Sequence, residues 1–200
     1  MAKEEETIRG WHFVGETLRD GSAIPKNGVW LPRLTGPIRL CENGYHGSKH
    51  PFDALRYAPG DTLCLCEYRG HVAYMSDKFA ARQRRIIMRM DASEMLRYFA
   101  RMQALSVAHL WNPPEVVLDW LMTGDLSLRS AALSAASVTY SAADNAVYSA
   151  AFAAAFAAAN DAARNAAYNT VNAAYGAAYN NARQEFADLV YECFGLDGDL

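Results

Sequence analysis

The segment CENGYHGS, residues 41–48, places several side chains capable of chemistry within eight positions. A histidine in a loop can hold a ribose hydroxyl or act as an acid or base near neutral pH. We therefore take Tyr45, His46 and Ser48 as candidate ligand-binding residues, with His46 and Ser48 as the catalytic residues if the protein is an enzyme. The alternative is a tight strand-to-helix turn with a structural histidine.

A basic cluster follows this segment. Its members are Lys78, Arg82, Arg84, Arg85 and Arg89. Such a cluster can bind nucleic acid, a nucleotide phosphate or an acidic protein face, and the alternative is a solvated strand edge. Because the formal net charge of the chain is −3, we favour the solvated edge or a small anionic ligand over duplex DNA. Lys78, Arg82 and Arg85 complete the candidate ligand-binding set.

The cysteines raise the question of a metal. Cys64 and Cys66, with Cys41, His46 and His50 nearby in sequence, could suggest zinc. Structural zinc sites usually pair cysteines two to four residues apart, whereas alternate cysteines on a strand are typical of core packing. We predict no metal and no cofactor. The acidic start, MAKEEE, differs from an export signal, so we expect reduced thiols in the cytoplasm.

The elements that must position these residues form a β-rich first part. Strands are expected over Thr7–Val14, Val29–Leu34, Ile38–Cys41, Thr62–Tyr68 and Arg85–Met90. Both faces of the fourth are apolar, which predicts a central strand. Asn43-Gly44 indicates a turn. Ser48 is expected to cap a helix from Pro51 to Ala58.

Helices follow this part. Asp91 is expected to cap a helix over Ser93–Ala104, and Pro113-Pro114 to open another that Gly124 closes. The most apolar run, Ala150–Ala159, has ten residues. A membrane span needs about 20, so we expect none.

The last third is rich in alanine, with 24 alanines among the 52 residues Ala131–Ala182. Alanine favours helix, and its small side chain lets helices approach closely. We expect an antiparallel helical hairpin or bundle, broken at 144–145 and 160–161, with one long dimerising helix as the alternative. The tyrosines proposed as a protein-binding face are Tyr148, Tyr168, Tyr175 and Tyr179.

The fold class predicted from these patterns is α+β. Residues 1–92 would form a β-rich domain, residues 93–124 connecting helices, and residues 125–200 an alanine-rich helical domain.

Residues 45–48, Tyr-His-Gly-Ser, resemble the His-Gly-Ser/Thr signature of diphtheria-toxin-like ADP-ribosyltransferases. The resemblance implies NAD as a cofactor, with His46 on its ribose. That family also uses a later tyrosine and usually a glutamate on separate strands. Tyr74 and Glu94 are the candidates here, in sequence contexts that differ from the family's.

A broader stretch, residues 40–91, resembles a family of uncharacterised phage and prophage proteins. The motifs that carry the resemblance are CENGYHGS, PFDALRYAPG, LCLCEYRG and DKFAARQRR. Members often carry an alanine-rich helical tail, as this chain does. The resemblance implies a bacterial host cell as the setting and supplies no activity.

Three hypotheses follow. The first is a phage or mobile-element protein that binds and inhibits a bacterial host protein or defence complex, as an anti-CRISPR protein does. The second is an NAD-dependent ADP-ribosyltransferase-like enzyme. The third is an immunity or structural protein that forms homo-oligomers through its tail.

Overall fold

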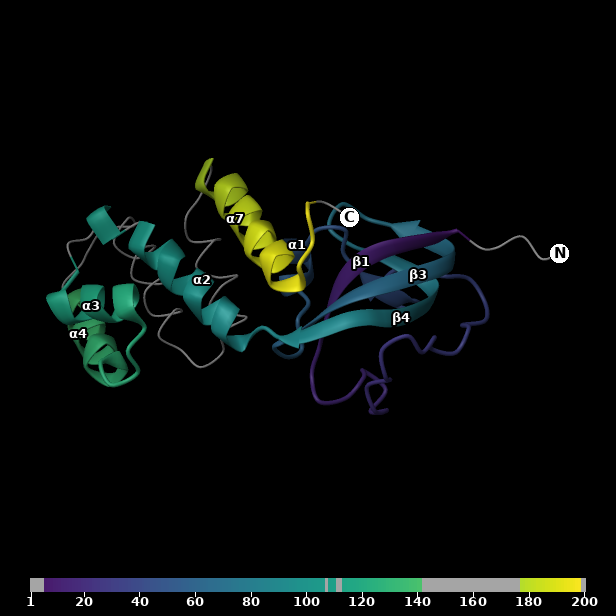
Figure 1. The fold of residues 1–200 in the computed structure, drawn as a ribbon, viewed down its shortest axis with the longest axis horizontal. Coiled ribbons are helices and arrows are strands. Elements are labelled where there is room, and N and C mark those ends of the chain that lie inside the picture. Colours follow the sequence, from purple (N-terminus) through teal and green to yellow (C-terminus); the bar gives the residue numbers. More distant parts are fainter. Residues whose placement is uncertain (1–5, 107, 111–112, 142–176, 199–200) are drawn as a thin grey trace. The chain divides into compact units, whose positions relative to one another are not determined.

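The computed structural model describes residues 6–106, 108–110, 113–141 and 177–198. The protein is α+β, with an antiparallel sheet in the first part of the chain and helices after it (Figure 1). The chain divides into two compact units. One comprises Met1–Ala92 with Ala187–Leu200, and the other Ser93–Phe186. The boundary proposed at residues 124 and 125 stays a prediction.

The sheet of the first unit has four strands in the described residues. They are β1 (Thr7–Val14), β2 (Tyr45–Gly47), β3 (Thr62–Tyr74) and β4 (Phe79–Asp91). Their order is β1-β3-β4-β2, and every neighbouring pair is antiparallel. The strands predicted over 7–14, 62–68 and 85–90 are confirmed. The expected central strand lies inside β3, between β1 and β4.

The two edges of this sheet meet. Trp11 at the β1 edge and Ser48 just after β2 exchange backbone hydrogen bonds of 2.8 and 3.0 Å. The register between β3 and β4 shifts at two irregularities, and such irregularities bend a sheet and increase its twist. The sheet therefore curls until its edge strands pair, which gives a small barrel.

Close packing inside the barrel depends on two glycines. A Cβ atom on Gly10 would lie 2.7 Å from Cζ of Phe79, and one on Gly47 would overlap the Tyr68 ring. The rings of Tyr68 and Phe79 meet edge to face at 4.7 Å. The residues of this buried cluster are Val14, Cys64, Cys66, Tyr68, Phe79, Ala81 and Ile86.

The opposite face of β1 and β3 is also buried. Trp11 pairs with Leu65 and Phe13 with Leu63, and all four are at most 2% exposed. The end of α7 (Ala177–Phe194) covers this face, with the Phe194 ring 5.0 Å from that of Trp11. The short helix α1 (Pro51–Leu55) packs against β1. Both faces of β3 are therefore buried, as a central strand requires.

Two expected strands are wrong. Residues 29–34 instead follow β4 irregularly, with the N–H groups of Gly28, Leu31 and Leu34 bonded to β4 carbonyls. That spacing of three differs from the period of two in a strand, and the proline at position 32 has no N–H to donate. Residues 38–41 enter a turn in which Arg39 and Asn43 bond to each other's backbone.

The side-chain cap expected at Ser48 is wrong. The N-cap of α1 is His50, whose Nδ1 accepts the N–H of Phe52 at 3.2 Å, and the helix ends at Leu55. Ser48 instead pairs with β1 through its backbone, because the closure of the barrel uses it there. Asp91 is the last residue of β4, two residues before the helix that begins at Ser93, and its role as a cap stays a prediction.

The second unit is helical in the described residues. It holds α2 (Ser93–Ser106), η1 (Ala108–Leu110), α3 (Glu115–Thr123), α4 (Arg129–Ser141) and the start of α7. The Phe99 and Phe186 rings meet at 5.1 Å, and the Gln103 amide donates to Glu185 at 2.6 Å. Gly124 ends α3 with a left-handed φ of 70°. The helices expected after Ser93 and after Pro114 are confirmed.

The alanine tract is described only at its flanks. Helix α4 buries Ala132 and Ala136, four residues apart, and α7 buries Ala182. The expected breaks at 144–145 and 160–161, and with them the hairpin, lie outside the described residues. In the part of the chain that is described, no helix has the length and apolar character that a bilayer crossing requires.

Candidate functional site

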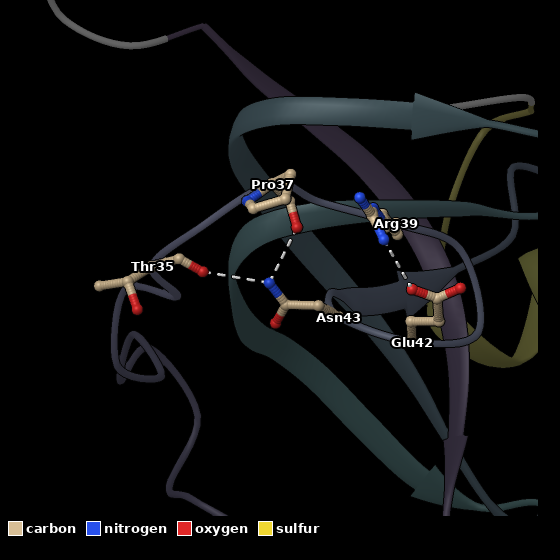
Figure 2. A network of polar contacts seen from close by, with 5 residues as sticks. All are labelled: Thr35, Pro37, Arg39, Glu42 and Asn43. Atoms are coloured by element: carbon tan, nitrogen blue, oxygen red, sulfur yellow. Dashed lines mark hydrogen bonds and ion pairs between the residues drawn. The ribbon is translucent and has the colours of Figure 1, made fainter.

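The loop before His46 is closed by side-chain contacts (Figure 2). The Asn43 amide donates to the carbonyls of Thr35 at 3.1 Å and Pro37 at 2.9 Å, while Arg39 pairs with Glu42 at 3.4 Å. Within this turn Cys41 has a left-handed φ of 67°. That conformation costs about 1 kcal/mol for a residue with a Cβ. The contacts of the loop therefore hold Cys41 in a backbone conformation that residues with a Cβ rarely adopt.

His46 supports this conformation directly. The Cys41 N–H donates to Nε2 of His46 at 2.9 Å. Burial, followed by the charges of Lys78, Arg19 and Arg84, lowers the pKa of His46, although the Gly44 backbone opposes the shift. The imidazole is therefore neutral at pH 7, and its Nε2 lone pair is used by the loop backbone. This arrangement is the structural role that the sequence left open as an alternative.

Lys78 lies beside the same cysteine. Its ammonium donates to Sγ of Cys41 at 3.3 Å and stands 4.2 Å from the centre of the Tyr57 ring. Burial would lower the pKa of Lys78, but hydrogen bonds to Cys41 and Tyr57 outweigh it and the pKa is raised. The Tyr57 hydroxyl donates to Asp77 at 2.6 Å. Cys41 thus connects two predicted site residues, His46 and Lys78.

Large apolar side chains are exposed around the turn between β3 and β4. Tyr57 is 41% exposed, and Tyr74 and Met75 are each 54% exposed. The Lys49 ammonium stands 5.2 Å from the centre of the Tyr74 ring. We call the group Lys49, Tyr57, Tyr74, Met75 and Lys78 the turn surface.

The other predicted ligand-binding residues lie elsewhere in the unit. Ser48 is buried at the barrel seam, and the Tyr45 hydroxyl donates to the Pro32 carbonyl at 3.0 Å. Arg82 donates to the Leu34 carbonyl at 2.7 Å. Arg85 pairs with Glu67, with Nε and Oε2 2.7 Å apart. The basic cluster that is compact in sequence is therefore divided among different surroundings.

The structure contains an arginine–tryptophan stack that was not predicted from the sequence. The guanidinium carbons of Arg69 and Arg85 lie 4.0 and 4.7 Å from the centre of the Trp30 ring. Arg69 also donates to the Gln83 amide oxygen at 2.9 Å. Such stacking is common between guanidinium and indole groups, but Trp30 lies far from both arginines in sequence, so no local pattern indicates it.

His12 and the inward position of Arg84 were also missed. Arg84 is 5% exposed and donates to the His46 carbonyl at 3.2 Å. Burial, then the charge of Arg84 and the charge that His46 gains on protonation, lower the pKa of His12 well below its usual value. His12 alternates along β1 with buried Trp11 and Phe13, so strand parity could have placed it on the barrel side.

The cysteines are free thiols. Burial is the main cause that raises the pKa of Cys64 to about 12 and that of Cys66 to about 11. Among the described residues, no group of three or more His, Cys, Asp or Glu side chains is placed to hold a metal ion.

Most of the tyrosines proposed as a protein-binding face lie outside the residues that the structure describes. Tyr148, Tyr168 and Tyr175 lie in the segment 142–176, and for Tyr179 only the backbone, in α7, is described. Their role stays a prediction.

A family model described as a domain of unknown function (DUF7666) matches residues 27–98. The match spans the loop before His46, the turn surface and Arg84, and covers just over a third of the chain. No curated protein and no solved structure matches the chain. The similarity therefore indicates no activity for this chain.

Proposed function

We propose that this chain is a binding protein whose turn surface contacts another protein. The observation that carries the proposal is the exposure of Tyr57, Tyr74 and Met75 beside two lysines. Tyrosine and methionine are enriched in protein interfaces, where a few such residues supply most of the binding energy. The aromatic rings offer apolar area, and the adjacent ammonium groups favour a partner with acidic residues.

The partner in this proposal is a bacterial host protein, with a nuclease defence complex as the specific target. The resemblance of residues 40–91 to phage and prophage proteins supports this setting, and with it the host cytoplasm as the location. Inhibition would follow if the bound chain covers a functional surface of the target.

A paired set of double variants tests the proposal. We expect tagged wild-type protein to capture a partner from host lysate, and Tyr74→Ser with Met75→Ser to reduce capture about ten-fold or more. The control is Tyr98→Ser with Met122→Ser, which removes a tyrosine and a methionine of similar exposure in the second unit, 45% and 58%. Equal capture by both double variants would refute the role of the turn surface.

The NAD-dependent transferase is the second candidate, favoured by the neutral imidazole of His46 near the Lys78 charge. The candidate for the glutamate of such an enzyme, Glu94, is less suited to catalysis. It lies in helix α2 rather than on a strand, and it pairs with Arg97 at 2.6 Å. Labelled NAD incubated with host extract should transfer its label only if this function is correct. His46→Gln keeps a hydrogen-bond acceptor for the loop and should then abolish transfer.

Self-assembly through the alanine-rich tail is a third proposal. Light scattering of the purified chain should give a mass above 22.0 kDa if it is correct.

A further inference from the structure

Arginines gather on the outer face of the barrel. Glu67 of β3 stands opposite Arg9 of β1 on one side and opposite Arg85 of β4 on the other. Arg69 follows Glu67 by two residues, so its side chain leaves the sheet on the same face. Arg9 is exposed, and the side chain of Arg85 is 36% exposed. This face of three neighbouring strands therefore presents guanidinium groups to solvent.

Two uncharged side chains hold three arginines close together. Oε1 of Gln83 accepts a hydrogen bond from Nε of Arg69 at 2.9 Å and another from Nη1 of Arg33 at 3.3 Å. The centre of the Trp30 ring lies 4.0 Å from the guanidinium carbon of Arg69 and 4.7 Å from that of Arg85. An amide and an indole carry no charge, so these contacts position the guanidinium groups without neutralising them.

The charge of this face is strongly positive. The paired positions on it are Thr7, Arg9, Glu67, Arg69, Gln83 and Arg85. Glu67 is the one acid among them and pairs with Arg85, so with Arg33 the face has four positive charges against one negative. The rest of the first part agrees, because residues 1–92 hold 14 lysines and arginines against 11 acidic residues, whereas residues 93–200 hold 5 against 11. We call Arg9, Arg33, Arg69, Arg85 and Trp30 the arginine surface.

We propose that the arginine surface binds single-stranded nucleic acid. It extends from β1 to the segment 28–34 beside β4, about 14 Å at the usual spacing between strands. An extended chain of phosphates can meet several arginines over that distance, and guanidinium groups bind phosphate oxygens in pairs. The partly exposed Trp30 ring and the guanidinium planes suit the stacking of unpaired bases. A duplex or an acidic peptide offers no such bases.

This proposal goes beyond the protein-binding role of the turn surface and uses other residues, so the failure of either leaves the other untouched.

Fluorescence anisotropy of the full chain with labelled strands of about 20 nucleotides tests the proposal, since this length exceeds a typical single-strand site. One strand is deoxythymidine and the other uridine, which separates DNA from RNA. At least one should bind saturably, with a dissociation constant that rises with salt, and more tightly than a duplex or a poly-glutamate peptide of equal length. Absence of saturable binding by both strands, or tighter binding of the duplex or the peptide, would overturn the proposal.

Matched double variants locate the binding. Arg69→Met with Arg85→Met should raise the dissociation constant of the strand about ten-fold or more. The control is Arg39→Met with Arg56→Met, which removes two exposed arginines that each lie 3.4 Å from a carboxylate elsewhere in the unit. Both double variants change the net charge equally. An equal loss of binding in both would show that only the net charge matters and would refute the assignment.

A second measurement needs no variant, so it does not depend on the folding of one. A strand that carries 4-thiothymidine or 4-thiouridine is cross-linked to the wild-type protein with ultraviolet light. Trypsin cuts after Lys26 and Arg33 and releases the peptide 27–33, which contains Trp30. The strand should label this peptide. Cross-links confined to other peptides would place the strand elsewhere and overturn the proposal.

Discussion

Arg84 and Arg85 are neighbours in β4, yet the two sides of the barrel wall give them opposite environments. Arg85 pairs with Glu67 and lies against the Trp30 ring, and its side chain is 36% exposed. Arg84 is buried among neutral groups, with its Nε unpartnered. An outer arginine can be satisfied by a carboxylate and by water, whereas an inner one has only the groups that the barrel provides.

The comparison extends to the other residues of the wall. The inner side is closely packed around glycines and aromatic rings. The outer side near Trp30 carries long polar side chains that keep contact with solvent. Substitutions inside should therefore cost more than substitutions on the outer side near Trp30. Five substitutions or conditions test that difference, in decreasing order of expected effect.

Gly47→Ala should have the largest effect. The added Cβ would overlap the buried Tyr68 ring, and overpacking of this kind costs about 1–3 kcal/mol. The free energy of unfolding in urea measures the loss. Gly15→Ala is the matched control, because its Cβ would meet the Pro59 carbonyl at an ordinary 3.4 Å. Equal losses in both variants would show that the barrel interior is not closely packed.

The stability should fall in mild acid because of His12. Its folded pKa lies well below the unfolded value, so its contribution is complete above the unfolded value near pH 6.5 and is lost as the pH falls toward the folded pKa. One such group gives a slope of at most about 1.4 kcal/mol per pH unit. Denaturant titrations between pH 7.5 and pH 5 measure this slope.

His12→Gln should flatten the acid slope. His46→Gln should flatten it less, because His46 is less buried and its pKa is lowered less strongly. A slope that is unchanged in His12→Gln would contradict the assignment of the acid loss to the barrel interior.

Tyr68→Phe should cost about 1 kcal/mol. The substitution removes the hydroxyl that donates to the His46 carbonyl at 3.0 Å and keeps the ring that fills the barrel. Tyr45→Phe is the control, because the Tyr45 hydroxyl makes a bond of the same length to Pro32 in a more exposed position. Its loss should be smaller, and the reverse order in urea unfolding would be evidence against the comparison.

Arg85→Met should have the smallest effect, below about 1 kcal/mol, because a partly exposed ion pair contributes little. A double-mutant cycle with Glu67→Gln isolates the pair. The coupling energy should decrease further in 1 M NaCl, where the Debye length is about 3 Å. A coupling larger than the loss in Tyr68→Phe would reverse the expected order of the two sides.

Much of the sheet could be predicted from the sequence. The alternation of residues 7–14 predicted a strand, and the two apolar faces of residues 62–68 predicted a central strand, because side-chain parity follows directly from strand geometry. The loop segments were harder. Residues 29–34 have an apolar composition that suits a strand, but they bond to β4 at every third residue. This irregular pairing depends on the surface of β4, which the local sequence of the segment does not contain.

The candidate site was predicted only in part. The distinctive spacing around His46 drew attention to a real structural centre, since His46 and Lys78 meet at Cys41. From the sequence, Arg84 was interpreted only as one member of a basic cluster, with no sign that it is buried. Irregularities in the pairing of β3 and β4 decide which arginines face inward, and the local sequence of β4 alone does not reveal them.

The sequence by itself determined most of the longer elements, β1, parts of β3 and β4, α2 and α3, because helix and strand preferences depend on near neighbours along the chain. Only the tertiary structure decided the closure of the barrel through Trp11 and Ser48, 37 residues apart. It also decided that Arg84 is buried while Arg85 reaches solvent. The physical reason is that the electrostatic environment of a charge is set by groups distant in sequence, which fold against it from every side.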